Sequence, residues 1–256
     1  MKNDLTVLTK IESMLQEAHI SYDALTHLEW IEQRKNGKTF SMSEHIRAMI
    51  YAMLSNNRRW EQIDENISVI DEIFFHYNSA RIRSASPEYF IQELLRIKCG
   101  NRNIRNQMTA LHGNIRKLER IDLEFGSIDQ FVVSGTPVEI ADLLSNSLKY
   151  KLNTLGFALA MEYLRNVGID TAKPDTLVRR ILGRSRLGYS RQEIANEIEA
   201  IEIIDTISAE TGYSPSKIDA ILWLFCSSGN GMICIEPPHC ERCLLRGSHC
   251  HRNSNC

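Results

Sequence analysis

Four cysteines near the end of the sequence have the residue type and spacing of a metal site. They are Cys234, Cys240, Cys243 and Cys250. The pattern C-x5-C-x2-C-x6-C places four thiols within 17 residues, and thiolates gathered in this way ligate iron–sulfur clusters or zinc. A single C-x2-C with one lone cysteine on each side favours a 4Fe–4S cluster, because zinc ribbons usually contain two C-x2-C pairs. Zinc and unligated thiols remain alternatives, and Cys226 or Cys256 could replace one of the four ligands.

The cysteines also bear on cellular location and on the role of the metal. Six of the seven cysteines follow residue 225, and clustered cysteines in a reducing compartment indicate metal binding before disulfides. The polar start Met1-Lys2-Asn3-Asp4 lacks the apolar segment of a secretory signal, so we expect an intracellular protein. A cluster with four protein thiolates has no free position for substrate, which predicts a structural role in the C-terminal loop.

A carboxylate occurs in the stretch Lys173-Pro174-Asp175-Thr176, just before a helical segment. Asp is favoured at helix N-caps, so Asp175 by itself indicates where a helix begins. A carboxylate fixed in this way can also stabilise developing positive charge or take a proton from attacking water. Asp175 is therefore both a structural and a catalytic candidate.

Basic side chains are gathered in two segments although the chain as a whole is nearly neutral. The 256 residues hold 30 Lys and Arg against 32 Asp and Glu, for a formal net charge of -2. Residues 96–122 carry seven basic and two acidic side chains, and residues 173–191 carry six basic and one acidic, a net of +5 each. The expected helix 192–210 carries six acids and no base. Such segments are consistent with a basic face that meets a phosphate backbone, or with ordinary solvated helix faces.

Helices are predicted along the whole sequence. Apolar residues recur with helical spacing, as in Ile46, Met49, Ile50 and Met53, and no segment alternates as a strand does. Capping-box spacing occurs at Ser41, Thr136 and Ser190, each with a Glu three residues later, and Pro follows Ser86, Thr136 and Ser214 at the expected first helical position. We therefore predict an all-α fold of ten to twelve short helices. With 43% hydrophobic residues the chain can form a core, and no apolar run is long enough to span a membrane.

A helical hairpin is predicted before Asp175. The expected helices cover residues 136–148 and 157–168, and the turn between them ends at Gly156. A turn of this kind directs the free N–H groups of its second helix towards an anion.

The order of these features resembles the endonuclease III branch of the helix–hairpin–helix DNA glycosylases. The hairpin is followed by Pro-Asp at the start of the next helix and by a four-cysteine tail, and the resemblance extends over residues 20–252. It implies two helical lobes: a six-helix barrel with the hairpin at 37–160, and a second lobe of 1–36 plus 161–256 that ends in the iron–sulfur loop. The implied partner is double-stranded DNA with a damaged or modified base, bound by a monomer.

The resemblance also implies roles for individual residues. Asp175 occupies the position of the catalytic aspartate, and Asn57, with Asn56 as the alternative, that of the wedge that fills the space of a base flipped from the duplex. The hairpin residues Leu152, Thr154 and Gly156 would hold a backbone phosphate, flanked by Lys149 and Lys151. Tyr163, Trp60 and Trp30 could stack on a flipped base, although aromatic residues at such spacing more often belong to a core.

The chain departs from the family pattern at several positions. Ala158 occupies the position of the lysine that forms a Schiff base in bifunctional relatives, so lyase activity is not expected. The hairpin reads Leu152-Asn-Thr-Leu-Gly156 in place of Leu-Pro-Gly-x-Gly, and Leu177 replaces a histidine. We therefore predict a monofunctional DNA glycosylase, with a non-catalytic DNA-binding or lesion-sensing protein as the alternative and a zinc-stapled helical adaptor as a third interpretation.

Overall fold

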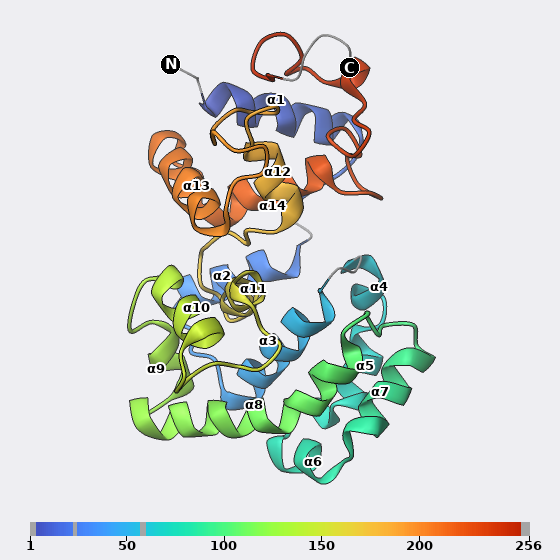
Figure 1. Ribbon diagram of the computed structural model, residues 1–256, viewed down its shortest axis with the longest axis vertical. Coiled ribbons are helices and arrows are strands. Elements are labelled where there is room, and N and C mark those ends of the chain that lie inside the picture. Colours follow the sequence, from blue (N-terminus) through green and yellow to red (C-terminus); the bar gives the residue numbers. More distant parts are fainter. Residues whose placement is uncertain (1–3, 23–24, 57–59, 252–256) are drawn as a thin grey trace. The chain divides into compact units, whose positions relative to one another are not determined.

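The computed structural model describes residues 4–22, 25–56 and 60–251 (Figure 1). These residues form 14 α-helices and two short 3-10 helices, and no strand occurs among them. The all-α prediction is confirmed, but the predicted number of ten to twelve helices is too small, because several connections contain helices of only five to seven residues. None of the described helices has the length and apolarity that a membrane crossing requires.

The chain divides into two units. Unit 1 comprises Met1–Glu29 and Asp170–Cys256, and unit 2 comprises Trp30–Ile169. The predicted boundaries are 36/37 and 160/161. The second boundary lies later in the structure because α11 (Phe157–Asn166) packs on α3 (Met42–Leu54) and α10 (Pro137–Asn146), which keeps it in unit 2.

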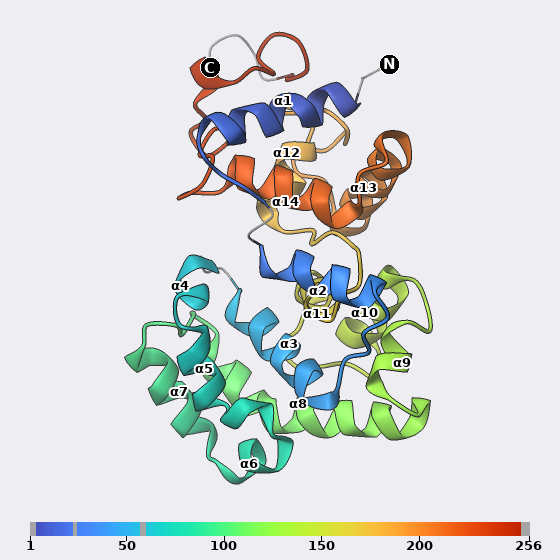
Figure 2. The same cartoon turned by 180° about the vertical axis from the view of Figure 1, so that it is seen from behind.

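Unit 2 is built around α3, whose C-terminal two thirds is buried on all sides. Ile46, Met49, Ile50 and Met53 are fully buried, as their helical spacing predicts. In Figure 2, α3 lies between α11 and α8, and it packs on both. The other elements of this unit are α2 (Thr26–Lys35) from Trp30 onwards, α4 (Trp60–Asp64), α5 (Ile67–Ile73), η1 (Phe75–Tyr77), α6 (Ser79–Ser84), α7 (Pro87–Arg96), α8 (Ile104–Phe125) and α9 (Ile128–Val132). The capping boxes at Ser41 and Thr136 are both formed.

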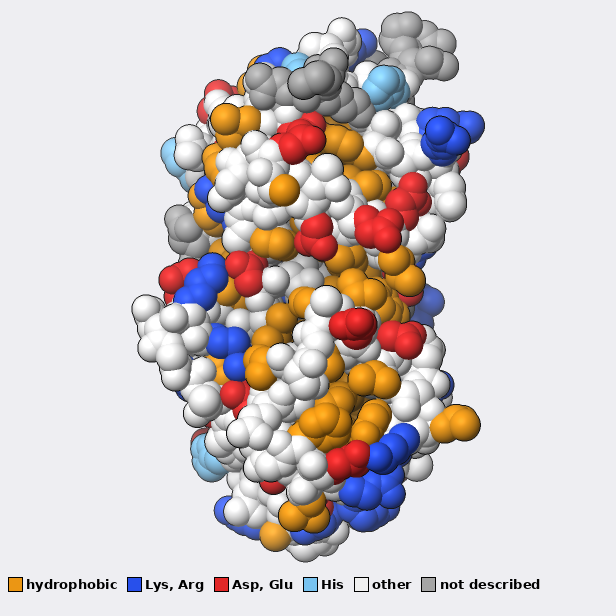
Figure 3. Space-filling view, turned by 90° about the vertical axis from the view of Figure 1, so that its left-hand side faces the viewer, with side chains coloured by type: hydrophobic (Ala, Val, Ile, Leu, Met, Phe, Trp, Pro, Cys, Tyr) orange, Lys and Arg blue, Asp and Glu red, His pale blue; other side chains and the backbone are white. Residues whose placement is uncertain are grey.

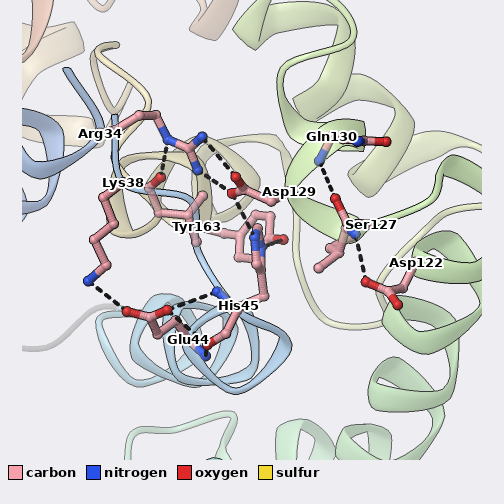
Figure 4. A network of polar contacts seen from close by, with 12 residues as sticks. Arg34, Lys38, Glu44, His45, Asp122, Ser127, Asp129, Gln130 and Tyr163 are labelled. Atoms are coloured by element: carbon pink, nitrogen blue, oxygen red, sulfur yellow. Dashed lines mark hydrogen bonds and ion pairs between the residues drawn. The ribbon is translucent and has the colours of Figure 1, made fainter. Parts of the chain in front are cut away.

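A buried polar network joins four helices of unit 2 (Figure 4). His45 on α3 bonds to the Tyr163 hydroxyl on α11 at 2.6 Å and to Asp129 on α9 at 3.1 Å. Because a carboxylate only accepts, Nε2 of His45 carries the proton and Nδ1 accepts from Tyr163. The guanidinium of Arg34, on α2, pairs with Asp129 and donates to the Val167 carbonyl at 2.7 Å. The network therefore connects the helix that follows the hairpin to α2, α3 and α9.

The charges of this network explain the shifted pKa values of its members. Burial disfavours the charged imidazolium and lowers the pKa of His45 below its ordinary value of 6.5. Burial alone would raise the pKa of Asp129, but the hydrogen bonds from His45 and Arg34 outweigh it and lower that pKa to about 2. Asp129 is thus held as a carboxylate and His45 as a neutral ring.

Unit 1 packs around α14 (Pro215–Cys226), most of whose residues are buried. Its partners are α1 (Asp4–Glu17), α12 (Thr176–Leu182) and α13 (Glu197–Thr211). A 3-10 turn, η2 (Cys240–Arg242), lies in the C-terminal loop. The Ser214-Pro215 start of α14 is formed as predicted, with Ser214 accepting the N–H of Lys217.

One predicted helix of unit 1 begins later than expected. The segment 192–210 was predicted as a helix capped by Ser190 with Glu193, but α13 starts at Glu197 and its capping box pairs Asn196 with Glu199. Ser190 instead donates its backbone N–H to the Leu182 carbonyl, and Glu193 pairs with Arg184 at 2.5 Å. These bonds hold the preceding loop against α12. The predicted cap, Ser190 with Glu193, is therefore wrong.

Candidate functional site

The hairpin connects α10 to α11 and is anchored by two buried leucines. The first predicted helix ends at Asn146, two residues earlier than expected, and the chain re-enters a helix at Phe157. Leu152 and Leu155 are buried at 0% and 1% exposure, and the Leu152 N–H donates to the Leu144 carbonyl at 2.8 Å. The apolar residues of the hairpin thus fix its backbone to unit 2.

Four of the five amide groups from position 154 to 158, at the end of the hairpin, have no partner in the described chain. The N–H groups of Thr154, Gly156, Phe157 and Ala158 bond to no described residue, whereas the Leu155 N–H donates to the Leu152 carbonyl at 3.2 Å. Three of the free groups lie at the N-terminal end of α11, where the helix dipole adds partial positive charge. Backbone donors of this kind are suited to an oxyanion such as a phosphate.

Thr154 adopts a backbone conformation that its side chain disfavours. Its φ is +69°, in the left-handed region, and a β-branched residue there is strained. Its hydroxyl is buried and has no hydrogen-bond partner. Gly156, by contrast, has an ordinary φ of −78°, and a Cβ there would meet open space. The position that requires glycine geometry in this hairpin is therefore 154.

One face of α8 holds the hairpin in place. Its contacting residues are spaced by three, three and four positions and are Asn114, Lys117, Arg120 and Glu124. Asn114 donates to the Asn153 carbonyl at 2.9 Å and accepts the Asn153 N–H at 2.7 Å. Lys117 donates to the carbonyl of Lys151, and Arg120 donates to that of Lys149 at 3.5 Å. We call these four residues the α8 row.

The two predicted lysines of the hairpin have different surroundings. Lys149 pairs with Glu124 of the α8 row, and the Tyr150 hydroxyl donates to the same carboxylate at 2.7 Å. These two partners lower the pKa of Glu124. Lys151 is exposed and forms no ion pair among the described residues. The structure therefore leaves the charge of Lys151 available, while that of Lys149 is already paired.

Asp175 caps α12 in unit 1, as the sequence predicts. Its Oδ1 accepts the N–H groups of Leu177 at 2.8 Å and Val178 at 3.0 Å. No described residue bonds to its Oδ2. One oxygen is thus used by the helix, and the second remains for another partner.

The segment that leads to Asp175 is fixed to α14. Asp170 accepts both the N–H and the hydroxyl of Ser216, at 3.2 and 2.6 Å. The buried Asp219 accepts the N–H of Lys173 at 3.2 Å. These two carboxylates, which no local sequence pattern marks, position the chain immediately before Asp175.

The predicted wedge falls at the edge of the described chain. Asn56 follows the C-cap of α3 and is partly exposed, and Asn57 lies outside the described residues. Two side chains fix the end of α3, because the Met53 carbonyl accepts an amide N–H from Asn101 and one from Gln107, each at 2.9 Å. The helix that carries Asn56 is therefore clamped just before this residue.

Two of the three aromatic candidates are core residues. Tyr163 is fully buried and its hydroxyl is held by His45. Trp30 is 7% exposed and packs against the Tyr51 ring. These side chains are not available to stack on a base in this structure. The side chain of Trp60 lies outside the described part of the chain.

The C-terminal cysteines lie in a loop that is tied to α12 and to its following loop. Arg180 donates to the Cys234 carbonyl at 3.0 Å, and the buried Arg186 pairs with Glu236 at 2.7 Å. Cys234, Cys243 and Cys250 are not in a disulfide, whereas Cys240 is disulfide-bonded. The fully buried Cys226 contacts Cys234, and burial raises the pKa of its thiol. The predicted ligands thus lie in one loop of unit 1, close to the helix that Asp175 caps.

The cysteine side chains have the right donor atoms for a metal group, but among the described residues their arrangement is not that of a ligand set. Thiols are the donors that an iron–sulfur cluster or zinc requires. The pKa of Cys243 is raised by burial and by the nearby Cys234 and Cys250. Among the described residues, however, no three His, Cys, Asp or Glu side chains converge as metal ligands do. The cluster and its ligand set therefore stay a prediction.

Comparison with known proteins identifies the class of fold. No family model and no curated protein matches the sequence. The 8-oxoguanine DNA glycosylase of Thermotoga maritima is 18% identical over 87% of this chain and 97% of its own, with a TM-score of 0.57. The 8-oxoguanine glycosylase/lyase of Methanocaldococcus jannaschii, solved with 15mer DNA containing 8-oxoguanine, is 19% identical over 86% and 96%, with a TM-score of 0.58.

These likenesses show a shared fold. The all-α fold is like that of the helix–hairpin–helix DNA glycosylases, which confirms this part of the prediction. The assignment to the endonuclease III branch stays a prediction.

Proposed function

We propose that this protein is a monofunctional DNA glycosylase, which hydrolyses the bond between a damaged or modified base and its sugar. The observation that carries the proposal is that the two carboxylate oxygens of Asp175 differ. One oxygen caps α12, and the other has no partner among the described residues. The glycosylase-like fold supports it, and so do the unpaired amides of the hairpin.

The chemistry requires a carboxylate that is held rigidly. Loss of the base leaves positive charge on the sugar, which a fixed carboxylate stabilises, and the same group can orient water or accept its proton. The two N–H groups at Oδ1 and the anchored segment before Asp175 restrict this side chain. In the proposed reaction Oδ2 faces the sugar or the water, while the hairpin amides bind a backbone phosphate of the flipped nucleotide's strand.

Ala158 is the basis for proposing hydrolysis without strand cleavage. A methyl group cannot form a Schiff base with the sugar, so the abasic site should remain intact until alkali or heat cleaves it. The Methanocaldococcus protein is described as a glycosylase/lyase. The proposed activity of this chain is the glycosylase half alone.

The test surveys lesions instead of assuming one. Duplexes containing 8-oxoguanine, and DNA treated separately by alkylation, oxidation and deamination, are incubated with the protein and with Asp175→Asn. New aldehydic abasic sites are then counted. We expect one class of DNA to respond to the wild type and not to the variant, which names the substrate class. Equal counts with both proteins on every DNA would contradict the proposal.

A non-catalytic DNA-binding protein is the second candidate. The observations that favour it are the strained Thr154 in the hairpin and the absence of the lysine at position 158. It predicts that the protein binds damaged duplex more tightly than undamaged duplex and releases no base. Base release that depends on Asp175 would exclude it.

We also propose that the C-terminal loop carries a 4Fe–4S cluster held by four of its cysteines, with zinc as the alternative metal. The thiol donors and their position in a single loop support this, and the cluster would stabilise that loop rather than take part in the reaction. Anaerobically purified protein should contain about four iron and four sulfide per chain, and Cys250→Ser should lower both. Protein with neither iron nor zinc would contradict the proposal.

A further inference from the structure

Two cations of the α8 row lie beside the hairpin and form no ion pair with an acid of the described chain. Lys117 and Arg120 each donate one bond to a hairpin carbonyl. An ammonium has three N–H donors and a guanidinium has five, so most of their hydrogen-bonding capacity is still free. Neither residue forms an ion pair within the described chain, whereas Glu119 pairs with Arg83 and Glu124 pairs with Lys149. Both acids thus have their ion pairs with other bases, although the charge of Arg120 also helps to lower the pKa of Glu124.

Lys151 adds a third unpaired cation at the same place. The Lys117 ammonium bonds to the main-chain carbonyl of Lys151. Burial, and then the positive charges of Arg120 and Lys151, lower the pKa of Lys117. Three like charges at this spacing repel one another, and a bound anion would relieve the repulsion. In Figure 3, several Lys and Arg side chains gather low on this face of the molecule, next to an acidic side chain.

The position of this cluster indicates which anion it takes. It adjoins the segment whose amides at Thr154, Gly156, Phe157 and Ala158 are free, and the Asn114 clamp fixes the main chain between the two groups. A polyanion with regularly spaced charges can occupy both groups at once. DNA has this chemistry, since each residue of its backbone carries one phosphate.

We propose that Lys117, Arg120 and Lys151 form a second phosphate-binding site, which contacts a DNA backbone phosphate next to the one bound by the hairpin amides. The inference rests on the proposed DNA binding but not on base release. Within the basic segment 96–122, the residues that would contact DNA are therefore those at the end of α8 beside the hairpin. Arg105, in the first turn of α8, is 70% exposed and lies 3.7 Å from Glu88, so it belongs to neither group.

The test is the salt dependence of binding to an undamaged duplex. The double variant Lys117→Gln with Arg120→Gln removes two charges but keeps amide donors for the hairpin carbonyls. Each lost phosphate contact reduces the slope of log K against log salt by about one unit. We expect a reduction of about one unit in the double variant, an unchanged slope in Arg105→Gln, and a wild-type slope in Lys117→Arg.

The possible outcomes separate this inference from the proposed function. A double variant with the wild-type slope overturns the second phosphate site, even if its melting temperature has fallen, because the two residues then only support the hairpin. An equal reduction in Arg105→Gln overturns it as well, since any cation would then have the same effect. A wild-type protein without salt-dependent DNA binding overturns the proposed function itself. Base release plays no part in these readouts, so a catalytically inactive protein tests the site equally well.

Discussion

At the scale of single residues, Asp175 combines a structural and a proposed catalytic role in one carboxylate. Asn accepts hydrogen bonds from helix N–H groups nearly as well as Asp, so Asp175→Asn should keep the cap and the thermal stability of the protein. Asp175→Ala removes the cap and should cost about 1 kcal/mol. Denaturant unfolding of the three proteins checks this. A large loss of stability in Asp175→Asn would show that the negative charge itself holds unit 1 together.

Thr154 is strained because its backbone is in the left-handed conformation. A left-handed conformation costs a residue with a Cβ about 1–2 kcal/mol, and Gly gives back about 0.5–1 kcal/mol of this through its greater freedom when unfolded. We therefore expect Thr154→Gly to stabilise the protein by about 0.5–1 kcal/mol. Thr154→Ala, which keeps a Cβ in the left-handed conformation and removes the hydroxyl and the methyl group beyond it, is the matched control. A lower melting temperature for Thr154→Gly would contradict this account of the hairpin.

At the scale of elements, α8 acts as the support of the hairpin. Asn114 is fully buried and makes both of its bonds to the Asn153 main chain. Asn114→Ala should cost about 1–3 kcal/mol and weaken DNA binding without a change in charge, because the Asn153 groups lose their partners. Asn106→Ala on the same helix, where the side chain is exposed and bonds only to Asn103, should be nearly neutral. Equal unfolding and DNA-binding measurements for the two variants would argue against a supporting role for α8.

The network around His45 predicts how stability depends on pH. The pKa of His45 is lower in the folded protein than its ordinary 6.5, so the unfolded chain binds more protons and stability falls as the pH drops below about 6.5. The pKa of Asp129 is also lowered, and its contribution is lost later, as the pH falls from 3.8 towards about 2. His45→Gln should therefore be less stable at neutral pH and should flatten the curve between pH 5 and 7.

Urea midpoints measured from pH 5 to 8 test this prediction. The difference between the wild type and His45→Gln should shrink as the pH falls. His76→Gln, at an exposed histidine, should run parallel to the wild type. A constant difference between the wild type and His45→Gln would show that the buried imidazole does not cause the loss of stability at acidic pH.

At the scale of the whole molecule, the sequence predicts the positions of the helices better than it predicts the hydrogen bonds and ion pairs that hold them and their loops in place. Helical spacing and the Ser-Pro and Thr-Pro starts locate most of the helices, because capping and periodicity are local properties. The first cap of α13 is predicted wrongly, since long-range bonds to α12 hold Ser190 and its loop. Local pattern cannot reveal such bonds.

The same limit applies to the site. The sequence places Asp175 and the hairpin, because both are marked by local residue types. It does not reveal Asn114, Asp219 or the pairing of Lys149 with Glu124, which join residues at least 25 positions apart. Nor does it distinguish the core role of Tyr163 from a base-stacking role, since an aromatic residue on a helix has the same pattern in both cases. The spacing of α8 at 114, 117, 120 and 124 was the available signal for its supporting face.

The central claim is that Asp175 supports hydrolytic release of a base from DNA. The most direct measurement is the amount of free base released in a single turnover from the responding duplex, by the wild type and by Asp175→Asn at concentrations where both bind the DNA fully. We predict release by the wild type, with the strand intact until alkali is added, and a loss of at least about a hundredfold in the variant. Equal release by the two proteins, or none by either while both bind the DNA, would contradict the account.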